Sequence, residues 1–586
     1  MKNTLLALLF ISGPAVLSLR AQPPATPPPA GAAKPDAAKP KPAPEGGIPV
    51  TDALVISKCA PCHTKDDKSN LTRISWSRTS PEGWQQVIKR MVRLNHLELK
   101  PEEARSIVKS LSTTHGLAPE EAKPVMFIPE QRMIDEQLPS DMMKDTCASC
   151  HPLARAASWR RSKEEWDLLI AMHMGYFPVT DISFRRFRGP NDNPAPGADN
   201  RQPFEQAAAY LTSNYALSTP EWASWRARMR SPKLSGRWLI SGYQAGRGKV
   251  IGEMVVEPSG SSEDEFNTNV KLTYIKDGST VTRSGKSFVY TGYSWRGRTT
   301  IASGVVPPAP GNAGGNPQEL REVMWVSPDQ STMEGRWFWG AYQEFGYDVK
   351  LQRAGEGPSV MSVDRTMLKT GSTAQRVKIY GDNFSRVAVG DIDLGHGVTV
   401  KSIVDQSPQQ ITVDVDVDAK ALLGKRDVAV RRAVAANAIA IYDKIDYVKV
   451  TPETGLARLG GTSHPKGFQQ FDAIAWNRGP DDKPNTPDDV ELGPVEATWS
   501  IEEFYAVYGD DDKDFIGTLS PSAFFTPASE GPNPKRKFSR NNYGDVWVVA
   551  TLKDEKGKDG KPISGKAYLV VTIPLYIRWD QPEVAR

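Results

Sequence analysis

The chain has 586 residues, which is too long for one hydrophobic core, and this length predicts about four domains. Its hydrophobic content of 39% and charged content of 24% are typical of an ordinary soluble protein. A net charge of +4 on a chain of this length is too weak to indicate binding to nucleic acid or to an anionic membrane.

The first residues have the pattern of a secretory signal peptide. Lys2 is followed by an apolar run that continues to about Leu19, and we expect cleavage after Ala21. A Gly13-Pro14 pair interrupts the run, and the length of the run is near the lower limit for crossing a bilayer, so we expect a cleaved signal and not an anchor. No later apolar run is long enough to span, so we expect export without membrane insertion.

Residues 22–47 are dominated by proline, alanine and lysine, a composition that buries little surface and favours an extended, disordered linker. From Val50 to about Tyr215, apolar residues recur at three- and four-residue spacing behind proline-capped starts, which predicts helices. The residues with the most specific chemistry lie in this helical part.

Two copies of the motif Cys-x-x-Cys-His contain every cysteine of the chain. Two thiols separated by two residues can each add to a vinyl group of one haem, and the next histidine then offers its imidazole to the iron. The motifs therefore predict two covalently bound haems c, and covalent haem in an exported bacterial protein indicates the periplasm. The predicted attachment residues and proximal ligands are Cys59, Cys62 and His63 for the first haem, and Cys147, Cys150 and His151 for the second.

Zinc and disulfides are the alternative uses of these cysteines. Paired Cys-x-x-Cys units bind zinc when about 15–20 residues separate the pairs. Cys62 and Cys147 are much farther apart, although a long insertion can separate the halves of a zinc site. A chain long enough to build a large core does not need a disulfide framework. Haem c is therefore the main interpretation.

A gapless repeat indicates where each iron finds its second axial ligand. Residues 80–91 align with residues 162–173, and in both copies a serine precedes a helix with glutamate in its first turn, as expected for an N-cap. An apolar stripe starts at tryptophan and continues three, four and seven residues on, ending at Met91 in one copy and His173 in the other. We therefore predict Met91 as sixth ligand of the first haem and His173 as sixth ligand of the second.

A core methionine and a buried histidine bonded to a carbonyl are the simpler interpretations of these two residues. Other candidate ligands are His96, His115, Met126 and Met133 for the first haem, and Met172 and Met174 for the second. Met172 and Met174 lie off the stripe at helical spacing. Because methionine ligation raises the reduction potential relative to bis-histidine ligation, we expect electrons to pass from the second haem to the first.

From about Trp222 the pattern changes to short strands separated by Gly, Asp and Ser turns, which is typical of an antiparallel barrel or sandwich. The predicted strands lie at 236–240, 250–256, 270–274, 287–290 and within 333–351. Two further β units follow, in which the patterns of 377–384 and 411–417 suit strands of immunoglobulin-type sandwiches. An acidic loop at 479–489 could hold calcium, but its spacing is not that of an EF-hand and acidic surface turns are commoner.

The predicted fold is multidomain, α plus all-β, with an N-terminal helical di-haem cytochrome c domain, an antiparallel β-barrel and two immunoglobulin-like β-sandwich domains. The predicted segments are a signal peptide at 1–21, a Pro/Ala-rich linker at 22–47, the di-haem domain at 48–218, the barrel at 219–354 and the immunoglobulin-like domains at 355–446 and 447–586.

Further local motifs accompany the two haem motifs. They are Thr-Ser-Pro-Glu-Gly-Trp at 79–84, Arg90-Met91, Glu165-Trp166, His-Met-Gly-Tyr-Phe-Pro at 173–178, Gly-Arg-Trp at 236–238, Gly-Arg-Gly at 246–248, Gly-Pro-Asn-Pro at 531–534 and Asn-Asn-Tyr-Gly at 541–544. In this order they make nearly the whole mature chain resemble the α subunit of quinohaemoprotein amine dehydrogenase. The long Pro/Ala linker departs from that pattern.

The resemblance implies a periplasmic complex of three different subunits. The α subunit carries two haems c, a β subunit folds as a propeller, and a small γ subunit holds cysteine tryptophylquinone, which oxidises a primary amine to an aldehyde and ammonia. Electrons then pass through the α-subunit haems to a soluble copper protein or cytochrome c. In the family one haem has histidine and methionine ligands and the other has two histidines, which matches the predicted pairs. The amine-oxidising site is on another chain, so no catalytic residue is expected here.

Two other functions are compatible with the sequence. The first is a stand-alone di-haem electron carrier whose β modules bind a partner. The second is a di-haem peroxidase, which needs one haem with an open coordination position.

Overall fold

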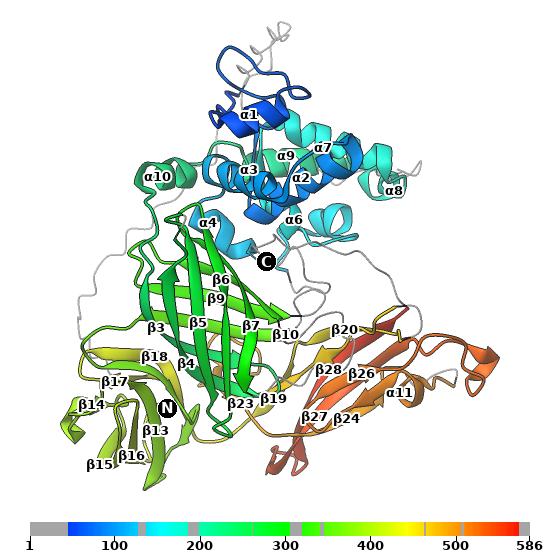
Figure 1. Cartoon of the computed structure of the whole chain (residues 1–586). Coiled ribbons are helices and arrows are strands. Elements are labelled where there is room, and N and C mark those ends of the chain that lie inside the picture. Colours follow the sequence, from blue (N-terminus) through cyan, green and yellow to red (C-terminus); the bar gives the residue numbers. More distant parts are fainter. Residues whose placement is uncertain are drawn as a thin grey trace, which may run out of the picture. The chain divides into compact units, whose positions relative to one another are not determined.

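The computed structural model describes residues 45–126, 136–185, 199–260, 262–304, 319–339, 345–461, 464–505 and 509–573. The predicted signal peptide and nearly all of the predicted linker lie outside these ranges. Within them, helices come first along the chain and strands follow (Figure 1). No helix of the described part combines the length and the apolar composition that crossing a bilayer requires. The predicted order of an α part followed by β parts is confirmed.

The α part consists of helices and one short strand pairing. Its helices are α1 (Ala53–Cys59), α2 (Pro81–Asn95), α3 (Pro101–Thr114), α4 (Pro119–Ala122), α5 (Asp141–Met143), α6 (Ala154–Ala157), α7 (Lys163–Tyr176), α8 (Thr180–Phe184), α9 (Pro203–Asn214) and α10 (Pro220–Arg228), with a 3-10 turn η1 (Lys123–Val125) and a π-helical turn η3 (Lys144–Ala148).

Serine caps begin the two helices of the sequence repeat. The hydroxyls of Ser80 and Ser162 both accept the backbone N–H three residues on, at 3.3 Å in each case. Trp84 of α2 is 2% exposed and Trp166 of α7 is 0% exposed. The stripe predicted from the sequence therefore faces the interior in both helices.

A short antiparallel pairing joins the two copies of the repeat. β1 (Ser77–Thr79) leads into α2, β2 (Trp159–Arg161) leads into α7, and the register places Arg78 directly opposite Arg160. Arg78 and Arg160 are also equivalent positions when the sequence repeat is extended backwards without a gap. A local two-fold axis therefore passes between these two arginines, with one copy of the repeat on each side.

Eight strands close into an antiparallel barrel in the order β10-β3-β4-β5-β6-β7-β8-β9. They are β3 (Gly236–Gln244), β4 (Gly248–Pro258), β5 (Glu265–Tyr274), β6 (Thr280–Tyr290), β7 (Ser294–Gly304), β8 (Glu319–Val326), β9 (Thr332–Trp339) and β10 (Phe345–Arg353). The strands predicted between 236 and 351 are present, and β7 and β8 are additional. The segment predicted for the barrel starts at 219, whereas α10 occupies 220–228 and the first barrel strand starts at Gly236.

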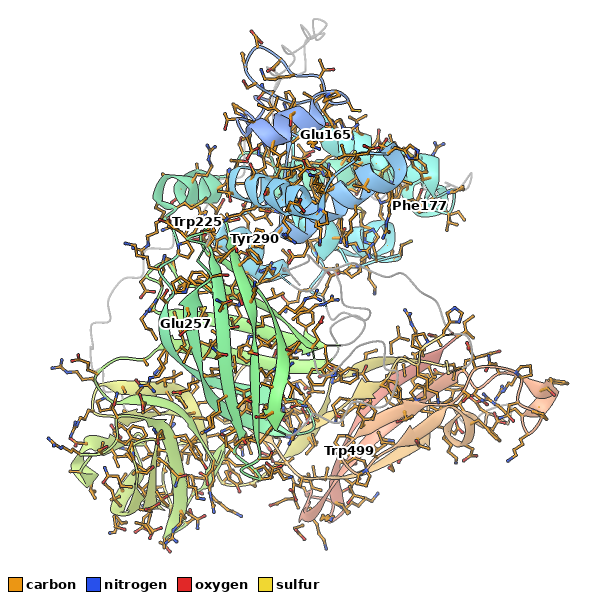
Figure 2. The ribbon with its side chains drawn as sticks, viewed as in Figure 1. Glu165, Phe177, Trp225, Glu257, Tyr290 and Trp499 are labelled. Atoms are coloured by element: carbon orange, nitrogen blue, oxygen red, sulfur yellow. The ribbon has the colours of Figure 1, made fainter. Side chains whose placement is uncertain are left out.

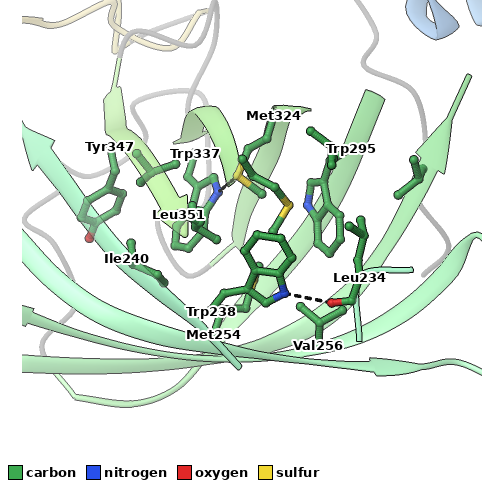
Figure 3. Close-up of a cluster of buried hydrophobic side chains, with 14 of the residues drawn as sticks. Leu234, Trp238, Ile240, Met254, Val256, Trp295, Met324, Trp337, Tyr347 and Leu351 are labelled. Carbon is green, nitrogen blue, oxygen red and sulfur yellow. Dashed lines mark hydrogen bonds between the residues drawn. The ribbon is translucent and has the colours of Figure 1, made fainter. Parts of the chain in front are cut away.

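Large apolar side chains from alternate strand positions fill the barrel. Trp238, Trp295 and Trp337 are completely buried and pack with methionine and aliphatic side chains (Figure 3). Trp238 Nε1 donates to the carbonyl of Leu234 at 2.9 Å, so the polar atom of this indole is satisfied. The barrel interior is a packed core.

Specific contacts join the α part to the barrel. Tyr293, between β6 and β7, donates its hydroxyl to the carbonyl of Leu117 at 3.0 Å. Trp225 of α10, labelled in Figure 2, packs edge-on against Tyr293 with ring centroids 5.3 Å apart. Arg296 of β7 forms a buried ion pair with Glu82 in the first turn of α2. The barrel thus supports the start of this helix.

The next β unit packs two four-stranded sheets on a shared apolar core, in the orders β11-β13-β16-β15 and β12-β18-β17-β14. Its strands are β11 (Ser359–Val363), β12 (Met367–Lys369), β13 (Gln375–Asp382), β14 (Ile392–Asp393), β15 (Val398–Gln406), β16 (Gln410–Val417), β17 (Gly424–Val430) and β18 (Ala433–Tyr442), with a 3-10 turn at Val389–Asp391. β13 and β16 confirm the strands predicted at 377–384 and 411–417.

The last β unit has sheets β19-β22-β23, β20-β28-β27-β24 and β21-β26-β25 around one apolar cluster. Its elements are β19 (Tyr447–Thr451), β20 (Thr454–Arg458), β21 (Gln469–Gln470), β22 (Asp472–Asn477), β23 (Val490–Pro494), β24 (Thr498–Glu503), α11 (Asp512–Phe515), β25 (Gly517–Leu519), β26 (Phe524–Pro527), a 3-10 turn at Lys537–Ser539, β27 (Gly544–Lys556) and β28 (Pro562–Thr572). The predicted fold class, α plus all-β with a barrel and further β domains, is confirmed.

Candidate haem sites

The first Cys-x-x-Cys-His motif starts at the last residue of α1. The Asp52 side chain caps α1 by accepting the N–H of Leu54 at 2.8 Å, and the helix buries Cys59. The N–H of His63 donates to the carbonyl of Cys59 at 2.9 Å, which makes the motif one compact turn. His63 Nδ1 lies 2.8 Å from the carbonyl oxygen of Thr72, an arrangement that places the proton on Nδ1 and presents Nε2 to a metal.

The second motif starts in the π-helical turn η3. Ser140 caps α5, whose residue Met143 is completely buried, and η3 follows with Cys147 in it. Single π-helical turns occur frequently at functional sites. His151 Nδ1 lies 3.0 Å from the carbonyl oxygen of Pro152, so this ring also presents Nε2 to a metal.

His173 of α7 lies close to His151. Their ring centroids are 6.4 Å apart, and His173 Nδ1 lies 2.8 Å from the carbonyl oxygen of Leu169, one turn earlier in the helix. The rings of Phe177 and Phe184 lie 5.9 and 6.3 Å from that of His173. Phe177, labelled in Figure 2, follows the last residue of α7. The second motif and α7 thus meet beside two phenylalanine rings.

The spacing of His151 and His173 suits a metal between two imidazoles. A metal–imidazole bond is about 2 Å long and each ring centre lies about 1 Å behind its nitrogen, so an ion with two axial imidazoles holds the ring centroids about 6 Å apart. The observed 6.4 Å is close to this value. Because both Nδ1 atoms face carbonyls, the Nε2 atoms are the ones available for binding. The two rings are therefore spaced as two histidine ligands of one iron would be.

Met91 occupies the position in α2 that His173 occupies in α7. In both helices the tryptophan and the residue four positions on are buried, while the last residue of the stripe is partly buried. Met91 Sδ accepts a hydrogen bond from Asn95 Nδ2 at 3.6 Å. Among the contacts of the described residues, none joins Met91 to His63. Their assignment to one haem rests on the repeat and stays a prediction.

His115 is unsuited to bind iron. Its side chain is completely buried, Nδ1 lies 2.8 Å from Thr114 Oγ1, and Nε2 lies 3.1 Å from the carbonyl oxygen of Ile48. Burial lowers the pKa of His115 to about 4, against the opposing effect of the hydrogen bond to Ile48. The protein engages both ring nitrogens, so His115 is a structural residue.

The other residues considered as sixth ligands of the irons lie in different parts of the α region. His96 ends α2 in a left-handed conformation with φ of 54° and is exposed. Met126 packs against the barrel core, and Met174 lines a groove between α7 and α9. Met172 is partly buried. Met133 lies outside the described residues.

The four cysteines form neither a disulfide nor a zinc site. No two of the four are bonded to each other. Within the described ranges, the only group of three or more Cys, His, Asp or Glu side chains close enough to share a metal is Asp510–Asp512, so the two motifs do not converge on one ion. Burial raises the pKa of Cys59 to about 11, with a further contribution from Cys62, and burial raises the pKa of Cys147 to about 11. Before a haem is attached, these two thiols are therefore protonated at neutral pH.

Contacts within the protein close the acidic loop at 479–489. Asp489 accepts the N–H of Asn485 at 2.6 Å, and Asp482 pairs with Lys558. The metal-ligand group found in the described residues lies elsewhere. The calcium interpretation of the loop gains no support.

The two copies share hydrogen bonds that the sequence did not predict. The carbonyl of His115, after α3, accepts the N–H of Thr79 at 3.0 Å and the indole N–H of Trp84 at 2.9 Å. In the second copy, the carbonyl of Tyr215, after α9, accepts the equivalent two donors at 3.1 and 3.0 Å. Both α3 and α9 begin with proline and carry glutamate at their third position, which is the sequence signal for this equivalence.

Two helical repeats with Cys-x-x-Cys-His motifs, joined to an eight-stranded barrel and two further β units, define a multidomain haem-binding protein of the redox class. The chain belongs to the family of the quinohemoprotein amine dehydrogenase alpha subunit. The matching family models are its haem-binding domain at 50–188, domain II at 231–354, domain III at 357–443 and domain IV at 448–584. The resemblance seen in the sequence is confirmed, and with it haem binding and membership in an amine dehydrogenase complex.

The other comparisons add little. No curated protein matches the chain. A de novo designed fluorescence-activating β-barrel is 18% identical, covers 20% of this chain and 93% of its own, and has a TM-score of 0.15. A Bacteroides ovatus protein of a mixed-linkage glucan utilization locus, SGBP-B, is 11% identical, covers 48% of this chain and 66% of its own, and has a TM-score of 0.18. TM-scores this low support no conclusion about the chain.

Proposed function

We propose that this chain is the electron-transfer subunit of a periplasmic quinohaemoprotein amine dehydrogenase. It receives electrons from a cysteine tryptophylquinone on a small γ subunit, where a primary amine becomes an aldehyde and ammonia, and it passes them to a soluble copper protein or cytochrome c. A β-propeller subunit completes the complex. The observation that carries the proposal is the pairing of His151 with His173 behind a Cys-x-x-Cys-His motif in a chain of this family.

Two covalently bound haems c are part of the proposal, and their irons supply one-electron transfer when bound. Each haem is held by the two thiols and the proximal histidine of one motif. The sixth ligands are Met91 and His173. The carbonyls of Thr72 and Pro152 hold the proximal rings in the tautomer that presents Nε2, and the carbonyl of Leu169 does so for His173.

The order of transfer follows from the ligand types. A thioether ligand favours the reduced iron more than a second imidazole does, so the site with Met91 has the higher potential. Electrons enter at the His151/His173 site and leave from the His63/Met91 site. No residue of this chain is assigned to the amine chemistry, which belongs to the γ subunit.

The periplasmic location rests on the signal-like residues 1–21 and on the motif for covalent haem attachment. Both features require export, since haem c is attached outside the bacterial cytoplasm. We expect the mature chain to begin after Ala21.

Isolation of the chain from its native host tests this function. The proposal predicts that a propeller subunit and a small quinone-bearing subunit co-purify, and that a primary amine reduces the haems of the complex but not those of the isolated chain. Recovery of the haem-loaded chain alone, with no quinone-bearing protein, would favour a stand-alone carrier. An open coordination position at one haem would favour a peroxidase.

A further inference from the structure

A buried cluster of three charged side chains lies on the local two-fold axis of the α part. The carboxylate of Glu121, in α4, accepts hydrogen bonds from both Arg78 of β1 and Arg160 of β2. Arg78 donates to its two carboxylate oxygens at 2.9 and 3.0 Å, and Arg160 Nε donates to one of them at 3.0 Å. The exposed fractions of Arg78, Arg160 and Glu121 are 0%, 6% and 6%. We name these three residues the axial charge cluster.

The axial charge cluster carries a net positive charge. Among the described residues, Glu121 is the only carboxylate that forms an ion pair with either arginine. Burial would raise the pKa of Glu121, but hydrogen bonds and charges from Arg78 and Arg160 outweigh it and hold that pKa below its usual value. The carboxyl group is therefore ionised at neutral pH. Two guanidinium groups and one carboxylate leave one positive charge uncompensated.

The two arginines of the cluster occupy equivalent positions in the two copies of the repeat. Arg78 lies two residues before Ser80, the cap of α2, and Arg160 lies two residues before Ser162, the cap of α7. The strand register makes the two arginines symmetry equivalents. The cluster therefore joins the strand before the helix that carries Met91 to the strand before the helix that carries His173.

We propose that Glu121, Arg78 and Arg160 act as a shared electrostatic centre that sets the reduction potentials of both haems in the same direction. The proposal rests on the proposed function. Reduction adds one negative charge to a haem, and a fixed positive charge stabilises that form. Because the cluster is buried, salt screens its field much less than that of a surface charge. These three are positioning and tuning residues, since none of them is assigned as an iron ligand.

Two substitutions that change the charge in opposite directions test the idea in the haem-loaded full chain. Glu121→Gln adds one unit of net positive charge and is expected to raise both haem potentials. Arg160→Gln removes one unit and is expected to lower both. Arg160→Lys keeps the charge without the guanidinium fork and is expected to restore values close to wild type. Loss of packing alone would not give shifts of opposite sign.

A matched control lies next to the cluster in sequence. Arg228 pairs with Glu120 at 3.1 Å, but both side chains are half exposed, so Arg228→Gln is expected to leave both potentials unchanged. The measurement is a spectroelectrochemical titration that resolves the two haems, with absorption spectra to check that the ligands are unchanged and unfolding midpoints to check the fold. If Glu121→Gln does not fold, Arg78→Gln replaces it, and as the symmetry partner of Arg160→Gln it must lower both potentials.

The outcomes separate the two proposals. Absence of covalent haem from the purified chain would overturn the proposed function. The shared electrostatic centre would be overturned, and the electron-transfer role left intact, if haem-loaded Glu121→Gln and Arg160→Gln shift the potentials the same way. The same holds if any of these charge changes moves one haem alone or neither, or if Arg78→Gln and Arg160→Gln shift the potentials in opposite directions.

Discussion

The imidazole rings of His151 and His173 lie with their centroids 6.4 Å apart, and each has Nδ1 beside a backbone carbonyl oxygen. One ring follows a Cys-x-x-Cys pair and the other ends the apolar stripe of α7. With two histidine rings at this distance, this is the more completely formed of the two candidate haem sites.

Loss of the His173 imidazole is expected to change the second haem alone. His173→Ala removes the sixth protein ligand, so the low-spin signal of one haem should become high-spin in absorption and paramagnetic resonance spectra. His173→Met should keep a ligand and raise the potential of that haem. Met172→Leu, one residue away and off the stripe, serves as the control. An unchanged low-spin signal in His173→Ala would exclude His173 as the ligand.

Replacement of Met91 by histidine is expected to make the two sites alike. Met91→His should abolish the sulfur-to-iron charge-transfer band and lower the potential of the first haem towards that of the second, because a second imidazole replaces the thioether. Met126→Leu is the control, since Met126 packs on the barrel core. If the band disappears in Met126→Leu and persists in Met91→His, then Met126 and not Met91 is the sulfur ligand of the first haem.

His115 is expected to affect stability and not the haem spectra. His115→Gln leaves at least one buried partner unsatisfied, which should cost about 1–3 kcal/mol. The folded-state pKa of about 4 is below the ordinary 6.5, so the stability due to neutral His115 is present above pH 6.5 and is lost as the pH falls towards 4, by about 3 kcal/mol. Unfolding midpoints between these pH values, compared with those of His115→Gln, measure the effect. A changed haem spectrum would show that His115 is a ligand after all.

The local part of the site could be predicted from the sequence. A Cys-x-x-Cys-His unit is complete within five residues, and the apolar stripe that ends at Met91 or His173 follows from helical periodicity alone. The axial charge cluster could not, because Glu121 lies 43 residues from Arg78 and 39 residues from Arg160. The residues next to Glu121 in the sequence do not show that it will be buried in an ion pair with two distant arginines.

Two barrel strands escaped prediction for a related reason. β7 and β8 pair Gly297 with Glu322 on the inner wall of the barrel, where the alternation of a strand calls for an apolar residue. The Trp295 indole donates to the Glu322 carboxylate at 2.9 Å, and the carboxylate lies over the space that a side chain at position 297 would need. Glu322 finds its hydrogen-bond partner only in the folded barrel. The sequence pattern around it therefore lacks the apolar alternation that would predict β8.

Glu322 also gives the barrel a pH dependence. Burial raises the pKa of Glu322 to about 7, although the Trp295 hydrogen bond and the Arg283 charge oppose it. The stability due to the protonated carboxyl is present below about pH 4.5 and is lost as the pH rises towards 7, by about 3 kcal/mol.

Glu322→Gln cannot ionise, so its unfolding midpoint should exceed that of the wild type increasingly from about pH 4.5 to 7. Glu319→Gln on the same strand, where the carboxylate is partly exposed beside Arg298, is the control and should not show this trend. Parallel pH profiles for Glu322→Gln and the wild type would mean that Glu322 ionises normally in the folded barrel.

The intact mass of the mature chain under denaturing conditions tests the central claim most directly. With haem attached through Cys59, Cys62, Cys147 and Cys150, the mass must exceed that of the polypeptide after Ala21 by two haems, and it must fall by one haem in the double variant Cys59→Ser/Cys62→Ser. A mass equal to that of the bare polypeptide, from a host able to attach haem c, would contradict the claim.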